Sequence, residues 1–195
     1  MPYSKAHKQN SRERILNSAI ELFSRHGFDQ VSIDDLMTHA SLTRGAFYAH
    51  FSSKSDVYFH AITAAAINAF ANNDYHQTDT GAAWLRRFVG VYLSVEHVEQ
   101  KGSPCPLAFM VSDVASKDPK VRQAYTKVFA GFADILNEHM AIESQSKSPT
   151  VNLSLAISAM MIGSVAIGRA IADNGLRRQL LQASSEITKQ LLGIA

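Results

Sequence analysis

Residues 32–54 read SIDDLMTHASLTRGAFYAHFSSK, and this stretch decides the fold of the N-terminal part of the chain. Ser32 followed three residues later by Asp35 is the pattern of a capping box at the start of a helix. Thr43 then begins a second short segment, in which two phenylalanines share one helical face. Two short helices joined by a tight turn near residues 40–42 indicate a helix-turn-helix, whose second helix enters the DNA major groove.

The second short helix is expected to have one face for packing and another for DNA. Phe47 and Phe51 are the apolar positions that hold it against the preceding helix. Arg44, Gly45 and Tyr48 fall on the opposite face. An arginine can donate two hydrogen bonds to one guanine, and a glycine lets the backbone approach the DNA closely.

Phosphate contacts are expected from side chains around this helix. Tyr48, His50 and Lys54 carry donors that suit phosphate oxygens. Three more basic residues stand near the N-terminus and are expected to add contacts of the same kind: Lys5, Lys8 and Arg12. Each of these residues taken alone is more often an ordinary solvated side chain, so the prediction depends on their joint spacing.

The spacing T-R-G-A-x-Y-x-H-F-x-x-K in residues 43–54 resembles the tetracycline-repressor (TetR) family, particularly its AcrR-like efflux regulators. The resemblance covers Arg12 to about Tyr58. It implies a homodimer in which a DNA-binding domain, residues 1–56, precedes a helical ligand-binding and dimerisation domain, residues 57–195. It also implies a repressor that binds a palindromic double-stranded DNA operator and is released by a small-molecule effector. The DNA-contact positions of the family fall on Ser32, Thr43, Arg44, Gly45, Tyr48, His50 and Lys54.

One position departs from the family pattern in the turn. Ser41 stands where the family usually has glycine. Serine adopts a left-handed backbone conformation less readily than glycine, so a slightly different turn is expected.

Composition favours an all-helical, soluble protein. The chain has 195 residues, is 46% hydrophobic, and contains no proline between Tyr3 and Ser103, which disfavours a turn-rich β fold. A single cysteine excludes a disulfide scaffold and fits a reducing compartment. The net charge of +2 does not by itself demand an anionic partner, and the polar residues 1–10 show no signal peptide. We therefore expect a cytoplasmic protein.

Apolar periodicity and capping signals place the helices. The first is expected to begin at Ser11 and end at Gly27, and Ser53 with Asp56 is expected to cap a helix that stops near Asn72. The later helices are expected over Gly81–Lys101, over Leu107–Ser116, from Asp118–Pro119, from Ser148–Pro149 to Asp173, and from Leu176 to Leu191 after a break at Gly175.

The last two helices carry the dimerisation prediction. Residues 149–168 contain no charge, but the serines among them and the continuation of the same face to Arg169 argue against a membrane span. Small residues such as Ala159 and Gly163 permit close helix approach. Together with the stripe from Leu176 to Leu191, they favour burial against a second copy of the chain. A purely intramolecular core is the alternative.

The ligand of the second domain is expected to be a small apolar or electrophilic molecule. Aromatic, methionine and cysteine side chains at helical spacing are candidates for its pocket, although such stripes are more often core. They are Trp84, Phe88, Tyr92, Cys105, Phe109, Tyr125, Phe129 and Met160. Cys105 stands at an expected helix start, where the helix dipole favours a thiolate. The resemblance extends to family members that sense electrophiles through a cysteine in this region.

No enzymatic activity, cofactor or metal is expected. The sequence lacks the G-x-S-x-G, H-E-x-x-H, P-loop and Rossmann glycine patterns. Its eight histidines are dispersed. Two alternatives to the ligand-released repressor stay open: a redox-responsive repressor acting through Cys105, and an architectural DNA-binding protein without a ligand.

Overall fold

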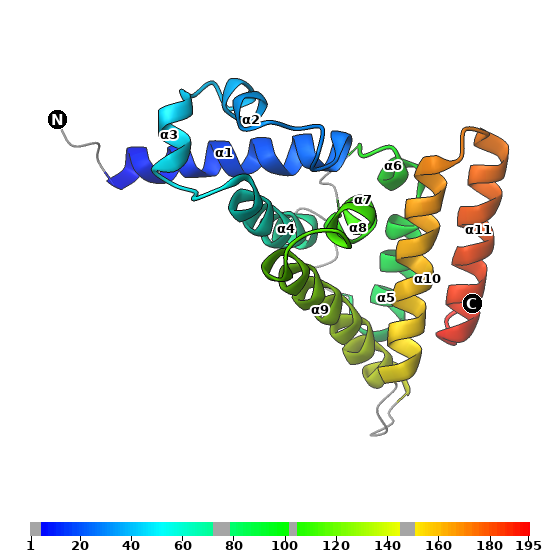
Figure 1. Ribbon diagram of the computed structural model, residues 1–195. Helices are drawn as coiled ribbons and strands as arrows, with labels where there is room; N and C mark the ends of the chain where they lie inside the picture. Colours follow the sequence, from blue (N-terminus) through cyan, green and yellow to red (C-terminus); the bar gives the residue numbers. More distant parts are fainter. Residues whose placement is uncertain (1–4, 72–78, 102–104, 145–150) are drawn as a thin grey trace. The chain divides into compact units, whose positions relative to one another are not determined.

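The computed structural model describes residues 5–71, 79–101, 105–144 and 151–195, and these form α-helices without any strand (Figure 1). The prediction of an all-α fold with an N-terminal helix-turn-helix is confirmed. The helices are α1 (Lys5–His26), α2 (Ile33–His39), α3 (Arg44–Tyr48), α4 (Lys54–Ala71), α5 (Gly81–Tyr92), α6 (Val95–Val98), α7 (Pro106–Phe109), α8 (Val111–Val114), α9 (Pro119–Ser144), α10 (Val151–Ala170) and α11 (Asn174–Leu191).

The chain divides into two compact units. Unit 1 comprises Met1–Asn68 and Pro104–Thr126, and unit 2 comprises Ala69–Ser103 and Lys127–Ala195. Unit 1 thus combines the helix-turn-helix with a segment from the middle of the chain. The predicted functional division after residue 56 stays a prediction.

Unit 1 is built around α1, which packs against α2 and α7, while α2 packs against α3. Phe23 on α1 and Tyr58 on α4 are fully buried, and their rings meet edge to face with centroids 4.8 Å apart. The predicted capping box begins α2: the Ser32 hydroxyl accepts from Asp35 N at 3.1 Å, and the Asp35 carboxylate accepts from Ser32 N at 2.8 Å. Local sequence therefore fixes where the helix-turn-helix starts.

Unit 2 contains the antiparallel pair α10 and α11, which pack together and also contact α5. Buried serines join the pair, since the Ser164 hydroxyl donates to the Ser184 hydroxyl at 2.7 Å. Arg177 on α11 donates to the carbonyls of Gly168 and Ile171, at 3.0 and 2.8 Å. These bonds satisfy carbonyls at the end of α10 that the helix itself leaves unpaired.

Several predicted helix boundaries are wrong. Helix α1 begins before Ser11, whose hydroxyl donates to the His7 carbonyl inside the helix at 2.9 Å. The helix expected over Gly81–Lys101 divides at Leu93, where ψ is 34°, and Ser94 caps the second piece. The helix expected over Leu107–Ser116 divides in the same way at Met110, where ψ is 2°.

The predicted break at Gly175 is also misplaced. Gly175 lies inside α11, and the chain turns before Asp173, whose carboxylate accepts from Leu176 N at 2.6 Å. The cap at Asp118 and the start at Pro119 are as predicted. The predicted stop near Asn72 and the cap at Ser148–Pro149 lie outside the described residues.

One helix among the described residues, Asn152–Ala170 in α10, is long and apolar enough to cross a membrane by length and composition. In the structure, 44% of that window is buried. Core helices of soluble proteins share these properties, so the helix is weak evidence for a membrane.

Candidate nucleic-acid interface

Helix α3 presents the predicted DNA-facing side chains to solvent. The side chain of Arg44 is 60% exposed and Tyr48 is 57% exposed, while Phe47 between them is fully buried. A Cβ atom built on Gly45 would meet no atom within 4 Å. The helix therefore has an open outer face and a closed inner face, as the sequence predicts.

Two further predicted DNA-contact residues, Ser32 and Thr43, are exposed and occupy the cap positions before α2 and α3. Ser32 caps α2 through its hydroxyl. Thr43 has the extended backbone of a cap before α3, but its side chain makes no capping bond. Its hydroxyl is therefore not committed to the helix start.

The turn between α2 and α3 contains a left-handed residue, although serine stands at position 41 where the family usually has glycine. Ser41 has φ of 52°, in the left-handed region. Arg14 on α1 donates to the carbonyls of Ala40 and Ser41 at 2.6 and 3.3 Å. This arginine fixes the turn from outside the motif, and nothing in the local spacing indicates it.

Arg44 has an ion-pair partner within the motif. Its Nη1 atom lies 2.6 Å from an oxygen of Asp34, in the first turn of α2. The Asp34 side chain is also exposed, at 59%. The guanidinium of Arg44 is therefore both exposed to solvent and paired with a carboxylate.

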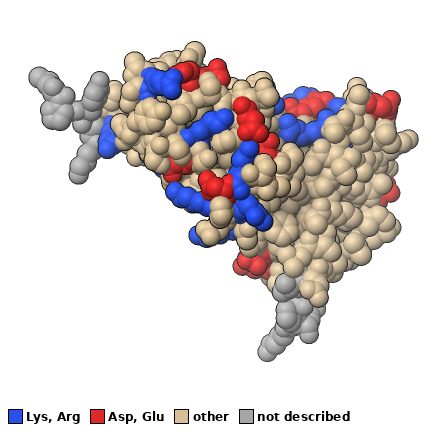
Figure 2. Space-filling view, in the orientation of Figure 1, with Lys and Arg blue, Asp and Glu red and all other residues tan. Residues whose placement is uncertain are grey.

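Basic side chains from α1 lie near His50. Burial, followed by the charges of Lys8 and Arg12, lowers the pKa of His50. The Arg12 guanidinium lies over the Phe51 ring, 5.2 Å from its centroid. Figure 2 shows Lys and Arg side chains over unit 1, interspersed with Asp and Glu. The N-terminal part of α1 thus adds positive charge beside the helix-turn-helix.

The ammonium of Lys54 is engaged by groups of the protein itself, and it is not simply free to bind phosphate. Its ammonium donates to the carbonyls of Phe28 and Val31 at 2.7 and 2.8 Å and lies 4.2 Å from the centroid of the Phe28 ring. Burial lowers the pKa of Lys54. The structure therefore gives Lys54 a role in holding the loop between α1 and α2, and its phosphate contact stays a prediction.

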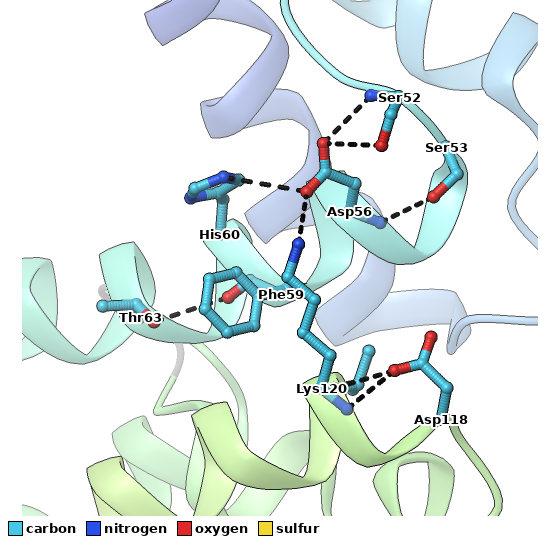
Figure 3. Close-up of polar contacts among 9 residues, drawn as sticks. Ser52, Ser53, Asp56, Phe59, His60, Thr63, Asp118 and Lys120 are labelled. Atoms are coloured by element: carbon cyan, nitrogen blue, oxygen red, sulfur yellow. Dashed lines mark hydrogen bonds and ion pairs between the residues drawn. The ribbon is translucent and has the colours of Figure 1, made fainter.

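A carboxylate organises the start of α4 (Figure 3). Asp56 accepts from the backbone N–H and hydroxyl of Ser52, at 2.9 and 3.2 Å, and from Lys120 at 3.3 Å. His60 Nε2 lies 3.9 Å from the same carboxylate. The bond from the Ser52 backbone is the main cause of the lowered pKa of Asp56. Lys120 belongs to α9, so this carboxylate joins α4 to the middle segment of the chain.

A second link connects the middle segment to the loop after α1. Asp113 on α8 accepts from the backbone N–H of Phe28 at 2.8 Å. Lys117 donates to Asp29 at 3.0 Å and lies over the Phe28 ring, 4.4 Å from its centroid. The Phe28 ring is thus contacted by two ammonium groups, those of Lys54 and Lys117.

Three of the predicted ligand-binding residues form a row on α5. Trp84, Phe88 and Tyr92 are buried, and the Trp84 and Phe88 rings stack with centroids 4.6 Å apart. The row continues with two rings that the sequence analysis missed: His139 stacks on Trp84 at 3.8 Å, and Phe132 lies 5.3 Å from Phe88. These rings pack directly against one another, as aromatic residues of a hydrophobic core do.

The other predicted ligand-binding residues divide between the units: Cys105, Phe109 and Tyr125 belong to unit 1, and Phe129 and Met160 belong to unit 2. Cys105 is 8% exposed and stands at the cap position of α7, and Phe109 is buried at the end of the same helix. Tyr125 donates to the Leu107 carbonyl at 2.7 Å, and burial raises its pKa well above the usual range. Phe129 on α9 and Met160 on α10 are half-buried.

A pocket of about 310 Å³ lies in unit 2, and none of the predicted ligand-binding residues lines it. Its lining is Leu93, Val95, Arg178, Leu181, Gln182, Ser185, Glu186 and Lys189. Among the described residues, no three His, Cys, Asp or Glu side chains gather as a metal site would require. The ligand-binding residues and the absence of a metal both stay predictions.

The capped α2, the left-handed turn and the exposed face of α3 define a protein of the helix-turn-helix class. Residues 15–61 match the sequence model of a family described as "Bacterial regulatory proteins, tetR family". Over these residues the chain is similar to the DNA-binding domain of the TetR family.

Known proteins resemble the chain in two different ways. It is 40% identical over 55 residues to the HTH-type transcriptional regulator AcrR of Shigella flexneri. That match covers 28% of this chain and 26% of AcrR, so the chain matches about a quarter of the curated relative's length. This similarity extends over about a quarter of either chain.

Solved structures resemble the chain over nearly its whole length. Reduced E. coli NemR has a TM-score of 0.76 at 17% identity, covering 92% of this chain and 95% of its own. A protein from Saccharomonospora viridis in complex with choline has a TM-score of 0.74 at 19% identity, covering 95% and 96%. At these identities the structures show a shared fold alone.

Proposed function

We propose that this chain is a one-component transcriptional repressor that binds a palindromic DNA operator as a homodimer and is released by a small-molecule effector. The observation that carries the proposal is the outer face of α3, where Arg44 and Tyr48 are exposed and a Cβ atom built on Gly45 would meet no atom within 4 Å. An arginine on such a face can read guanine, and the bare backbone at a glycine allows close approach to DNA. We place this activity in the cytoplasm.

The homodimer is supported by an unpartnered apolar stripe on α11. Leu176, Ile187 and Leu191 are 53%, 47% and 48% exposed, and Leu180 and Ala183 lie on the same helical face. On α10, Ile167 is 54% exposed, and Figure 2 shows few charged side chains over this helix. Apolar surface of this extent on two adjacent helices is typical of an interface.

The effector is inferred from the family and from a protein of the same fold. The choline complex shows that a protein of this fold holds a small molecule. AcrR, which is similar to this chain over 55 residues, is a transcriptional regulator. We infer an effector that is small and apolar or electrophilic, acting through the helices that follow α4.

A redox-responsive repressor is the second candidate, and the position of Cys105 favours it. The residue caps α7 within unit 1, which also contains the helix-turn-helix. NemR, which shares the fold, was solved in a form described as reduced. Modification of the sulfur would then take the place of a non-covalent effector.

The test is a selection of binding sites from random-sequence duplex DNA by the purified protein. A repressor of this kind selects a palindrome with half-sites about 34–36 Å apart, one helical turn. Arg44→Ala is expected to weaken binding to the selected site by about 1–3 kcal/mol and to relax the preference at one base pair. A wild-type protein that enriches no sequence contradicts the proposal, and sequence-independent bending of DNA would favour the architectural alternative.

A further inference from the structure

Asp34 lies in the first turn of α2, where its charge favours the helix N-terminus, but it makes no capping bond. The capping box of α2 is made by the neighbouring Asp35 with Ser32. Asp34 Oδ2 lies 2.6 Å from Arg44 Nη1, and this is the one polar contact of the Asp34 side chain among the described residues. Both side chains are more than half exposed, so the pair contributes little to stability. Its position on the outer face points instead to DNA recognition.

The chemistry of arginine shows what such a contact does. The guanidinium carries five N–H donors in one plane, and a bidentate contact with guanine uses two of them on one edge. A carboxylate bound at Nη1 leaves the Nε–Nη2 edge unoccupied. It also restricts the rotation of a long side chain, which otherwise loses conformational freedom on binding.

We propose that Asp34 is a positioning residue that fixes the Arg44 guanidinium for reading a guanine and thereby sets specificity at that base pair. The inference rests on the proposed function, because it needs α3 to enter a major groove. Asp34 takes no part in the base contact itself. Its carboxylate orients the arginine, and its negative charge opposes binding of the same arginine to any phosphate.

This second effect separates specific from non-specific binding. Non-specific affinity comes from cations that neutralise phosphates, whatever the sequence. With Asp34 beside it, Arg44 brings almost no net charge to the backbone. The pair therefore increases the affinity for DNA only where a guanine contacts the free edge of the guanidinium.

The experiment compares base preferences in selections from random-sequence duplexes for wild type, Asp34→Asn, Arg44→Ala and the double variant. For Asp34→Asn we expect the guanine preference at one position of each half-site to fall about tenfold. Preferences elsewhere are expected to stay unchanged, and affinity for non-specific duplex is expected to rise. In the Arg44→Ala background, Asp34→Asn is expected to change no base preference further, because the partner it positions is gone, and to raise affinity for all duplexes alike.

The controls distinguish this inference from the proposed function. Asp134→Asn removes an equal charge from an exposed site on α9 and is expected to leave every base preference unchanged. If wild type selects a palindrome and Asp34→Asn gives the same profile, the inference is wrong while the proposed function stands. A uniform loss at all positions, or a further change in base preference in the Arg44→Ala background, also overturns it. If wild type selects nothing, the proposed function fails. Asp34→Ala repeats the test should the asparagine variant melt early.

Discussion

The carboxylate of Asp113 accepts a hydrogen bond from the backbone N–H of Phe28 at 2.8 Å, across 85 residues of sequence. A side chain on a short helix in the middle of the chain therefore provides the hydrogen-bond acceptor for a backbone N–H in the loop that follows α1. The fit around it is close: Gly27 has φ of 77°, and a Cβ built there would lie 3.0 Å from Asp113 Oδ2. Within unit 1, this contact is one of several that join the middle segment to the N-terminal helices, together with Lys117–Asp29 and Lys120–Asp56.

Asp113→Ala is expected to destabilise the protein by about 1–3 kcal/mol, because the Phe28 N–H loses its acceptor in a part-buried place. Asp113→Asn keeps an acceptor oxygen and is expected to lose less. Urea unfolding of the variants measures the difference. Tyr58→Phe is the control, since the buried Tyr58 hydroxyl has no hydrogen-bond partner among the described residues and its loss is expected to be neutral. Equal stability of Asp113→Ala and wild type would contradict the prediction.

Gly45→Ala is expected to separate folding from DNA binding. The added methyl meets no atom within 4 Å, and alanine is the better helix former by about 0.5–1 kcal/mol, so thermal stability is expected to hold or rise. Operator affinity is expected to fall, because the methyl stands where the DNA backbone approaches. Gly131→Ala is the matched control: its Cβ also meets nothing within 4 Å, but it lies on α9 in unit 2. Unchanged operator affinity for Gly45→Ala would remove α3 from the interface.

The helix-turn-helix is predictable from sequence because its determinants are local. The capping box at Ser32 and the phenylalanine spacing act within a few residues, and the structure follows them. The contacts that sequence misses join residues far apart, as Arg14 does in reaching the turn at Ala40. Neither Leu93 nor Met110 is a glycine or proline, and the apolar periodicity runs through both breaks, so the sequence marks the first only by the serine cap at Ser94.

Lys54→Met is expected to affect stability as well as DNA binding. The change retains most of the apolar stem but removes two hydrogen bonds from a charged donor to the carbonyls of Phe28 and Val31. Bonds of this kind contribute about 1.5–3 kcal/mol each at most, so a clear loss in urea unfolding is expected. If Lys54 also contacts a phosphate, the salt dependence of DNA binding decreases by about one unit of slope.

Lys8→Met is the comparison for that experiment. Lys8 is exposed on α1 and near His50, so its loss is expected to reduce the salt dependence without lowering stability. A Lys54→Met variant as stable as wild type would show that the loop after α1 does not depend on this ammonium.

Dimerisation is expected to fail in two variants that leave the single subunit intact. A Cβ atom built on Gly163 meets nothing within 4 Å in the subunit, so we expect Gly163→Leu to fold but to keep a second copy from approaching. Leu180→Arg places a charge in the apolar stripe of α11, where burial against a partner is costly. Sedimentation is expected to give monomers for both. Gln182→Arg changes an exposed residue on another face of the same helix and is expected to remain dimeric. Dimers from all three would place the interface elsewhere.

Treatment with N-ethylmaleimide tests whether Cys105 transmits a signal to DNA. The thiolate adds to the maleimide double bond, and water protonates the resulting carbon, which leaves a bulky thioether on a residue that is 8% exposed. There is little room for this group at the cap of α7, so we expect α7 and α8 to shift and Asp113 to withdraw from Phe28. Operator release from wild type, followed by fluorescence anisotropy, is then expected, while Cys105→Ser stays bound. Equal release from both proteins, or from neither, would leave Cys105 as a packing residue and the non-covalent effector as the proposed signal.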